Sequence, residues 1–253
     1  MKTVAIIGFG RFGQLLAKIF LESTNYEILV ISSKRFPDES RLTFTDWQGL
    51  YRADIVIPAV PISAFEETLQ RISRFIHPQA VCMDVCSVKL FPVDIMQRYL
   101  PNSVSIIACH PMFGPVSFKK NNGLRGLRVV LHPIRVSRSV YAEISEFWRN
   151  LGLQIAEIDP EAHDKFAAQT QMYTFLIGKL TNLLNLDSTP IDTYWYSFFL
   201  EQANSVRDDG DTLFTDMLRY NRFSLNFIQE YESANHSIIE RSRQIIFSST
   251  NEI

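Results

Sequence analysis

A glycine-rich turn near the start of the sequence places the strongest constraint on the fold. The apolar run Val4-Ala5-Ile6-Ile7 leads directly into Gly8-Phe9-Gly10-Arg11-Phe12-Gly13, where an amphipathic stretch begins. In such a strand–turn–helix frame, the first glycine permits a tight turn, the second lets the backbone approach a pyrophosphate, and the third lets helix pack on strand. The free N–H groups of the helix N-terminus attract phosphate. A glycine motif alone is weak evidence, but in this frame it predicts a dinucleotide-binding turn made by Gly8, Gly10, Arg11, Phe12 and Gly13.

Short apolar runs alternate with amphipathic stretches through residues 1–158. This alternation indicates a mostly parallel sheet with helices on both faces. We therefore expect an α/β fold whose N-terminal domain, residues 1–158, is a Rossmann-type, doubly wound parallel sheet. The expected strands are 3–8, 27–32, 54–60, 80–85, 103–109, 126–133 and 154–158, and the expected helices are 12–22, 62–75 and 137–151.

Residues 159–253 have a different, helical pattern. Pro160 suits the first turn of a helix, and apolar residues recur at helical spacing from Phe166 to Leu184, which predicts one long helix there. Ser188-Thr189-Pro190 interrupts the pattern before further helical segments, and the aromatic stretch 194–199 is typical of a core or an interface. A small set of helices buries little surface by itself. We therefore expect this all-α region to pack on a partner subunit as well as on the first domain.

Composition excludes several classes of protein. The formal charge of −2 gives no electrostatic reason to expect nucleic acid or an anionic membrane as a partner. Neither a signal-peptide core nor an apolar segment of the roughly 20 residues that span a membrane is evident. The three cysteines lie in apolar runs at a spacing that is a poor zinc signal, so we expect packed, reduced thiols, a cytoplasmic protein and no metal.

The residues after the second expected strand bear on the choice of dinucleotide. An NAD site usually carries an acid about 20 residues beyond the glycines, but this chain has Ser32, Ser33, Lys34 and Arg35 there. Two hydroxyls and two cations suit a 2′-phosphate, so the sequence favours NADP, with NAD possible. The alternative interpretation is an ordinary solvated turn.

Candidate catalytic side chains stand where two expected strands end. His110 follows one apolar run, while Ser87 and Lys89 follow the preceding strand. Ligands of open α/β sheets bind beyond the carboxyl ends of the strands, and imidazole is the side chain whose pKa best suits a general base at neutral pH. Lys89 could help to hold the loop or meet a carboxylate, or it could be solvated.

Six segments together give the sequence a family resemblance that runs to about Thr193. The chain resembles the prephenate/arogenate dehydrogenases of tyrosine biosynthesis, and most of all the plant-type arogenate enzymes. The segments are GFGRFG, AVPISAF, DVCSVKLFP, CHPMFGP, EAHDKFAAQTQ and STPIDT.

The resemblance implies a nucleotide-binding domain, a helical dimerisation domain in residues 159–253 and an active site between them, in a homodimer. The implied reaction is oxidative decarboxylation, in which hydride passes to a nicotinamide and CO2 leaves as the ring becomes aromatic. His110 would take the proton of the ring hydroxyl, and Ser87 would hydrogen-bond to His110 and to that hydroxyl. The resemblance also places Ala59, Val60 and Pro61 beside the cofactor, and Met112 and Gln171 at the substrate.

Two positions depart from the family's pattern. Phe175 stands where the long helix of the family usually carries a histidine that holds the substrate. The arginine motif that binds the ring carboxylate in many bacterial members is absent, and Arg207 is a possible substitute.

The sequence leaves the substrate open between prephenate and arogenate. Two alternatives also stay open: a dehydrogenase of the same scaffold acting on a related substrate of secondary metabolism, and a non-catalytic, NADP-binding regulatory protein.

Overall fold

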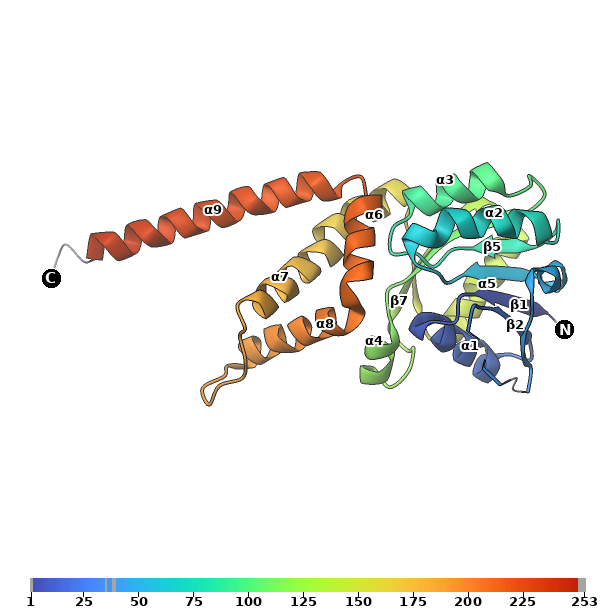
Figure 1. Cartoon of the computed structure of the whole chain (residues 1–253), viewed down its shortest axis with the longest axis horizontal. Coiled ribbons are helices and arrows are strands. Elements are labelled where there is room, and N and C mark those ends of the chain that lie inside the picture. The colour runs from blue at the N-terminus through green and yellow to red at the C-terminus, as the bar shows by residue number, and fades with distance from the viewer. Residues whose placement is uncertain (1, 35, 38–39, 250–253) are drawn as a thin grey trace.

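The computed structural model describes residues 2–34, 36–37 and 40–249, excluding the side chains of residues 208, 209 and 249. Within these residues, eight strands form one sheet in the order β3-β2-β1-β4-β5-β6-β7-β8 (Figure 1). The strands are β1 (Thr3–Ile7), β2 (Glu27–Ile31), β3 (Leu42–Phe44), β4 (Ile55–Pro58), β5 (Val81–Met83), β6 (Ser105–Pro111), β7 (Arg128–Arg135) and β8 (Gln154–Glu157).

Helices cover both faces of this sheet, because its strands are apolar on both sides. Val4 and Ile6 of β1 pack in the core that includes α1 (Arg11–Ser23) and α5 (Arg138–Asn150). Ala5 and Ile7, which alternate with them, pack in the core that includes α2 (Phe65–Phe75) and α3 (Leu90–Tyr99). Successive side chains of a strand point to opposite faces, so an unbroken apolar run fits this position. The expected doubly wound α/β architecture is confirmed.

Two features of the sheet differ from the expected pattern. The short edge strand β3 pairs parallel to β2 and was not predicted. The pair β6–β7 is antiparallel, whereas the other neighbouring strands are parallel. The connection from β6 to β7 contains α4 (Pro115–Lys120), a helix of six residues. At about 1.5 Å per residue such a helix is too short to carry the chain back along a strand, as a parallel crossover requires.

The helical region consists of α6 (Pro160–Gln169), α7 (Gln171–Leu183), α8 (Tyr194–Tyr220) and α9 (Ser224–Ser249). The single helix expected from Pro160 to Leu184 is in fact two, which meet at Thr170. The Thr170 hydroxyl donates to the carbonyl of Phe166 at 2.8 Å, a side-chain bond that is known to bend helices.

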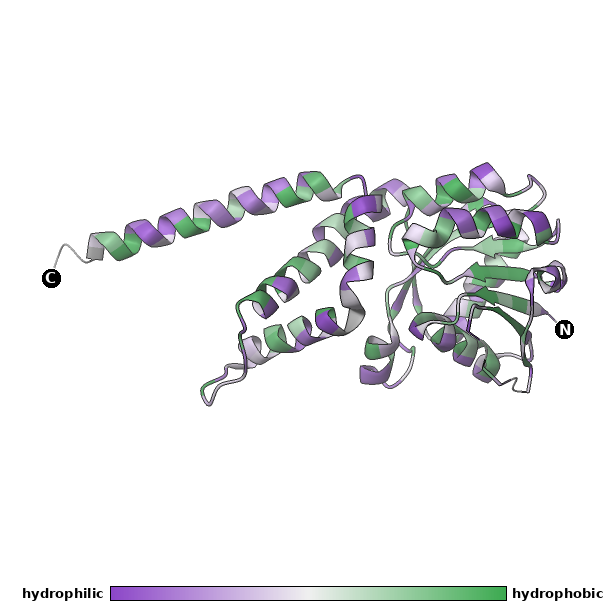
Figure 2. Cartoon of the chain, viewed as in Figure 1, coloured by the Kyte–Doolittle hydropathy of each residue, from purple (hydrophilic) through white to green (hydrophobic). Residues whose placement is uncertain are grey.

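Helix α8 changes direction at Gly210, whose φ of 76° is readily adopted only by glycine (Figure 1). Its C-terminal part therefore lies against the sheet domain while its N-terminal part packs on α7. Helix α9 extends away from the rest of the chain. Polar and apolar residues are mixed along α8 and α9 (Figure 2), and no helix of the described residues is long and apolar enough to cross a membrane.

A buried ion pair fixes the loop that follows β5. Lys89 is 1% exposed, and its Nζ pairs with Asp84, which is fully buried, and donates to the carbonyl of Cys109 at 2.5 Å. Asp84 in turn accepts from the backbone N–H groups of Cys86 at 3.0 Å and Cys109 at 3.1 Å. These bonds hold the ends of β5 and β6 together. Lys89 therefore holds this loop through the Asp84 carboxylate, and it is not solvated.

Substitution of Lys89 by Met should leave the Asp84 carboxylate buried without its counter-charge. We expect the free energy of unfolding to fall by about 3–5 kcal/mol, measured by urea denaturation. The matched control is Lys18→Met, because the Lys18 side chain is 56% exposed and its ion pair with Glu22 spans 3.9 Å; it should cost under about 1 kcal/mol. Equal losses in the two variants would contradict the role given to the buried pair.

Candidate active site

A cavity of about 500 Å³ lies beyond the carboxyl ends of the central strands. Its walls come from the β1–α1 turn, from the loops after β4, β5 and β6, and from helices α7 and α8. The cavity therefore lies between the sheet domain and the helical region. The predicted site residues that line it are Gly10, Arg11, Phe12, Gly13, Ala59, Val60, Pro61, Ser87, His110, Met112 and Gln171.

The glycine turn has the shape that a dinucleotide needs. Gly8 has a φ of 96°, and a Cβ there would lie 2.5 Å from the carbonyl oxygen of Ala59. A Cβ at Gly13 would lie 2.2 Å from the carbonyl oxygen of Gly8, so the helix and the turn touch. A Cβ at Gly10 would meet nothing within 4 Å, which leaves open space beside the N-terminus of α1. The turn thus offers backbone N–H groups and room for a pyrophosphate, so its residues fit a dinucleotide cofactor.

The residues expected to contact the cofactor's ribose follow β2, next to that turn. Gly8 N–H donates to the carbonyl of Ile31, the last residue of β2, at 2.8 Å. Ser32 Oγ accepts from the backbone N–H of Lys34 at 3.2 Å, and Ser33 and Lys34 are exposed. Arg35 lies outside the described residues.

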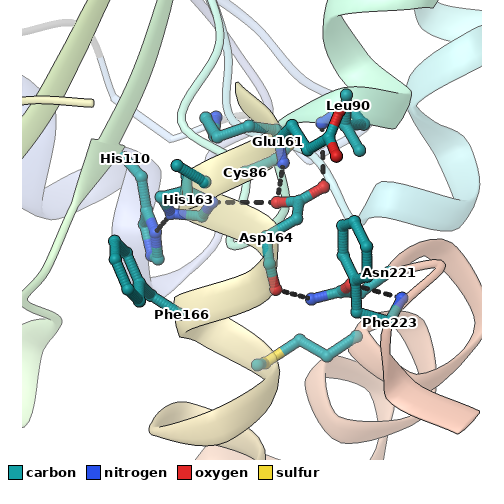
Figure 3. Close-up of polar contacts among 12 residues, drawn as sticks. Cys86, Leu90, His110, Glu161, His163, Asp164, Phe166, Asn221 and Phe223 are labelled. Atoms are coloured by element: carbon teal, nitrogen blue, oxygen red, sulfur yellow. Dashed lines mark hydrogen bonds and ion pairs between the residues drawn. The ribbon is translucent and has the colours of Figure 1, made fainter. Parts of the chain in front are cut away.

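His110 is the first member of a buried hydrogen-bonded chain (Figure 3). It is the penultimate residue of strand β6 and is 3% exposed, and its Nδ1 lies 2.8 Å from Nε2 of His163 on α6. His163 Nδ1 lies 2.8 Å from Oδ1 of Asp164. An ionised carboxylate only accepts hydrogen bonds, so His163 donates from Nδ1, and a neutral His163 then accepts at Nε2. His110 therefore carries its proton on Nδ1, which leaves the lone pair of Nε2 for the cavity.

Asp164 anchors this hydrogen-bonded chain where α6, α3 and the connection between α8 and α9 meet. Its Oδ1 accepts from the backbone N–H of Lys89 at 2.6 Å, and its Oδ2 accepts from that of Leu90 at 2.9 Å, so it caps α3. Its own carbonyl accepts from Asn221 Nδ2, between α8 and α9, at 2.8 Å (Figure 3). Nothing in the local sequence pattern signalled these contacts of Asp164.

The surroundings of His110 lower its pKa well below the ordinary 6.5. Burial is the main cause, because it disfavours the charged imidazolium, and the electrostatic interactions with His163 and Lys89 act in the same direction. The imidazole is consequently neutral at neutral pH and able to accept a proton. Because its pKa is depressed, its contribution to stability is present above pH 6.5 and declines as the pH falls below that value, where the unfolded chain binds the proton more readily.

The structure places the remaining predicted site residues differently, some at the cavity and one away from it. Ser87 lines the cavity, but among the described residues it makes no hydrogen bond with His110, whose Nδ1 bonds to His163. Gln171 also lines the cavity, and its Oε1 is buried without a hydrogen-bond partner. Arg207 does not line the cavity of this chain; its Nη2 donates to Asn182 Oδ1 at 2.7 Å. Phe175 forms part of the wall.

Helix α8 supplies wall residues that the sequence did not indicate. They follow the bend at Gly210 and are Thr212, Leu213, Asp216 and Met217. Only the tertiary fold brings this helix to the strand ends, so no local signal could have assigned them to the site.

Comparison with known proteins agrees with this geometry. Residues 41–157 match the family model described as prephenate dehydrogenase, nucleotide-binding domain. The chain is 32% identical over 97% of its length to arogenate dehydrogenase 1 of Arabidopsis thaliana, and 29% identical over 93% to arogenate dehydrogenase 2 of the same plant. Over nearly its whole length the chain is thus similar in sequence to arogenate dehydrogenases, and over residues 41–157 to the prephenate dehydrogenase family model. It spans 39% of the first of these relatives and 68% of the second.

Solved structures of this family share the fold. A prephenate dehydrogenase from A. aeolicus, in complex with hydroxyphenyl propionate and NAD+, superposes with a TM-score of 0.72 at 19% identity and covers 96% of this chain and 92% of its own. Synechocystis arogenate dehydrogenase gives a TM-score of 0.69 at 18% identity, covering 95% and 93%. These solved structures show the same fold, which extends through the helical region.

Proposed function

We propose that this chain catalyses the NADP-dependent oxidative decarboxylation of a cyclohexadienyl substrate, arogenate or prephenate. The observation that carries the proposal is the Asp164–His163–His110 chain beside the glycine turn, because it leaves one neutral, oriented base facing the cavity. The curated relatives are named for the same chemistry.

His110 performs the proton transfer of this reaction. Its Nε2 accepts the proton of the ring hydroxyl as hydride leaves the same ring carbon, so no discrete cation has to form. The bound nicotinamide supplies the hydride acceptor. The carboxylate on the opposite ring carbon then leaves as CO2, its bonding electrons complete the aromatic ring, and His110 returns the proton to the phenolate oxygen. Ser87, on the same wall, is placed to hydrogen-bond to the hydroxyl, and Gln171 and Met112 to contact the substrate.

The preference for NADP rests on the chemistry of the turn after β2. Ser32, Ser33, Lys34 and Arg35 provide hydroxyls and cations, and no acid, where a ribose 2′-phosphate would lie. The solved relative from A. aeolicus is described with NAD+, so NAD is the alternative cofactor.

A crossed assay of both substrates against both cofactors tests the proposal. We expect reduced cofactor to form, with NADP giving the higher kcat/KM, and His110→Gln to lower kcat about 10²- to 10⁴-fold while NADP still binds. The control variant is His236→Gln, because His236 is exposed and does not line the cavity. NADP binding without turnover of either substrate would indicate a non-catalytic protein, and turnover of only other hydroxy acids would indicate a related dehydrogenase.

We also infer that the chain forms a homodimer through its helical region. Large apolar side chains are exposed there, including Ile191 at 87% and Trp195 at 68%, with Leu183, Phe198 and Ile238 more than half exposed. So many large apolar side chains exposed in one region are unusual on a monomer. The projecting helix α9 offers a face that a second copy would cover (Figure 2).

Sedimentation equilibrium of the full chain should give twice the mass of one chain. We expect Ile238→Asp to shift the population to monomer, because the two-fold contact would then bury two unpaired charges. Asn235→Asp, at an exposed polar position on the same helix, should remain dimeric. A monomeric wild type would contradict the inference.

A further inference from the structure

A second cavity, of about 520 Å³, lies in the sheet domain away from the candidate active site. The two cavities share no lining residue. Lys2, just before β1, and Tyr26, just before β2, line the second one, so it lies near the amino ends of these strands. Its volume is within the range of small-molecule sites, and nothing in the proposed reaction uses it.

Aromatic rings from two helices form the walls of this cavity. Phe20 of α1 stacks on Phe147 of α5, with ring centroids 5.2 Å apart and an interplanar angle of 2°. The Trp148 ring meets both edge-on, with centroids 6.3 Å from Phe20 and 5.1 Å from Phe147. Ile55 and Met83, both buried, add apolar surface from the sheet. Such walls suit a flat, apolar ring system.

Trp148 also brings a hydrogen-bond donor that has no partner. The residue is 0% exposed and lines the cavity, and its Nε1 donates to no acceptor among the described residues. A buried indole N–H usually finds an acceptor, and leaving one unpaired is costly. An acceptor atom that enters the cavity beside Trp148 would remove this cost, so the wall favours a ligand with an acceptor at its inner end.

The polar groups around the cavity do not favour an anionic ligand. Of the described residues that line it, Lys2, Glu143 and Glu146 carry formal charges, and Lys2 Nζ pairs with Glu143. Glu146 adds a further negative charge, so the cavity offers an anion no net attraction. The amide of Asn150, which is exposed, can both donate to and accept from a polar group of a neutral ligand.

We propose that this cavity is a binding site for a neutral aromatic molecule whose acceptor oxygen receives the hydrogen bond of Trp148 Nε1. The aromatic ring of the ligand packs among the side chains of Phe20, Phe147 and Trp148, and its oxygen pairs the buried donor. The site is independent of the reaction, so it stands whether or not the proposed function holds.

NMR of the indole N–H groups in the full chain, with acetophenone as the probe, tests the proposal. Acetophenone is neutral and has a carbonyl acceptor but no donor. The sequence holds three tryptophans, Trp47, Trp148 and Trp195, and the resonance of Trp148 is the one that Trp148→Phe removes. We expect acetophenone to shift this resonance downfield and saturably while the other two stay in place. Benzoate, which is similar in shape but anionic, should bind more weakly.

Three variants separate binding in the cavity from binding elsewhere, with affinity followed at the backbone amide of Ile144, which also lines the cavity. Trp148→Phe keeps an aromatic wall without the donor, and should weaken acetophenone binding roughly 2- to 10-fold, the range of a hydrogen bond between uncharged groups. Asn150→Phe keeps the donor but narrows the cavity, and should abolish the shift. Arg149→Phe is the matched control, because Arg149 is exposed and does not line the cavity, and it should bind as the wild type does.

Several results would overturn the proposal. One is a Trp148 resonance that millimolar acetophenone leaves unmoved in the wild type, and another is a shift that persists unchanged in Asn150→Phe. Equal affinity in Trp148→Phe and the wild type would show that the indole N–H does not hold the ligand. Binding of benzoate as tight as that of acetophenone would contradict the preference for a neutral molecule.

Discussion

The carboxylate of Asp164 is the contact on which the arrangement of the site depends. It accepts the backbone N–H groups that begin α3, and it accepts from the His163 ring, so one side chain of the helical region caps a helix of the sheet domain and orients an imidazole. The residue is fully buried, where charge-assisted hydrogen bonds are strong and an unsatisfied carboxylate would be costly. The position of α6 against the sheet and the geometry of the base are therefore set by the same bonds.

A second buried carboxylate, Asp84, complements it from within the sheet. Asp84 and Lys89 tie the end of β5 to the end of β6, which places Ser87 and His110 on one wall. The N–H of Lys89 bonds to Asp164 while its side chain bonds to Asp84, so this residue connects the two networks. The base is in this way fixed from both domains, and the water-poor environment that results keeps it neutral.

Local patterns in the sequence were sufficient to predict the sheet, the glycine turn and the grouping of Ser87 with His110. Each depends on short-range periodicity or on the rule that parallel strands end at one edge. The contacts that were missed join residues far apart in the chain: His110 to His163, Lys89 to Asp164, and Ser63 to Asp216. The structure shows no Ser87–His110 bond among the described residues, and it pairs Arg207 with Asn182 away from the cavity, which local patterns also did not indicate. The break at Thr170 arose from a side-chain hydroxyl that hydropathy does not register.

The account's central claim is that Asp164, through His163, fixes His110 with its Nε2 lone pair toward the cavity. Nitrogen-15 NMR of the histidine rings at neutral pH, in the full-length protein, tests this most directly, because the shifts of protonated and unprotonated ring nitrogens differ widely. The account predicts that His110 is neutral and protonated on Nδ1, and that this tautomer preference is lost in Asp164→Asn. A His110 ring that is protonated on Nε2, or charged, would contradict it.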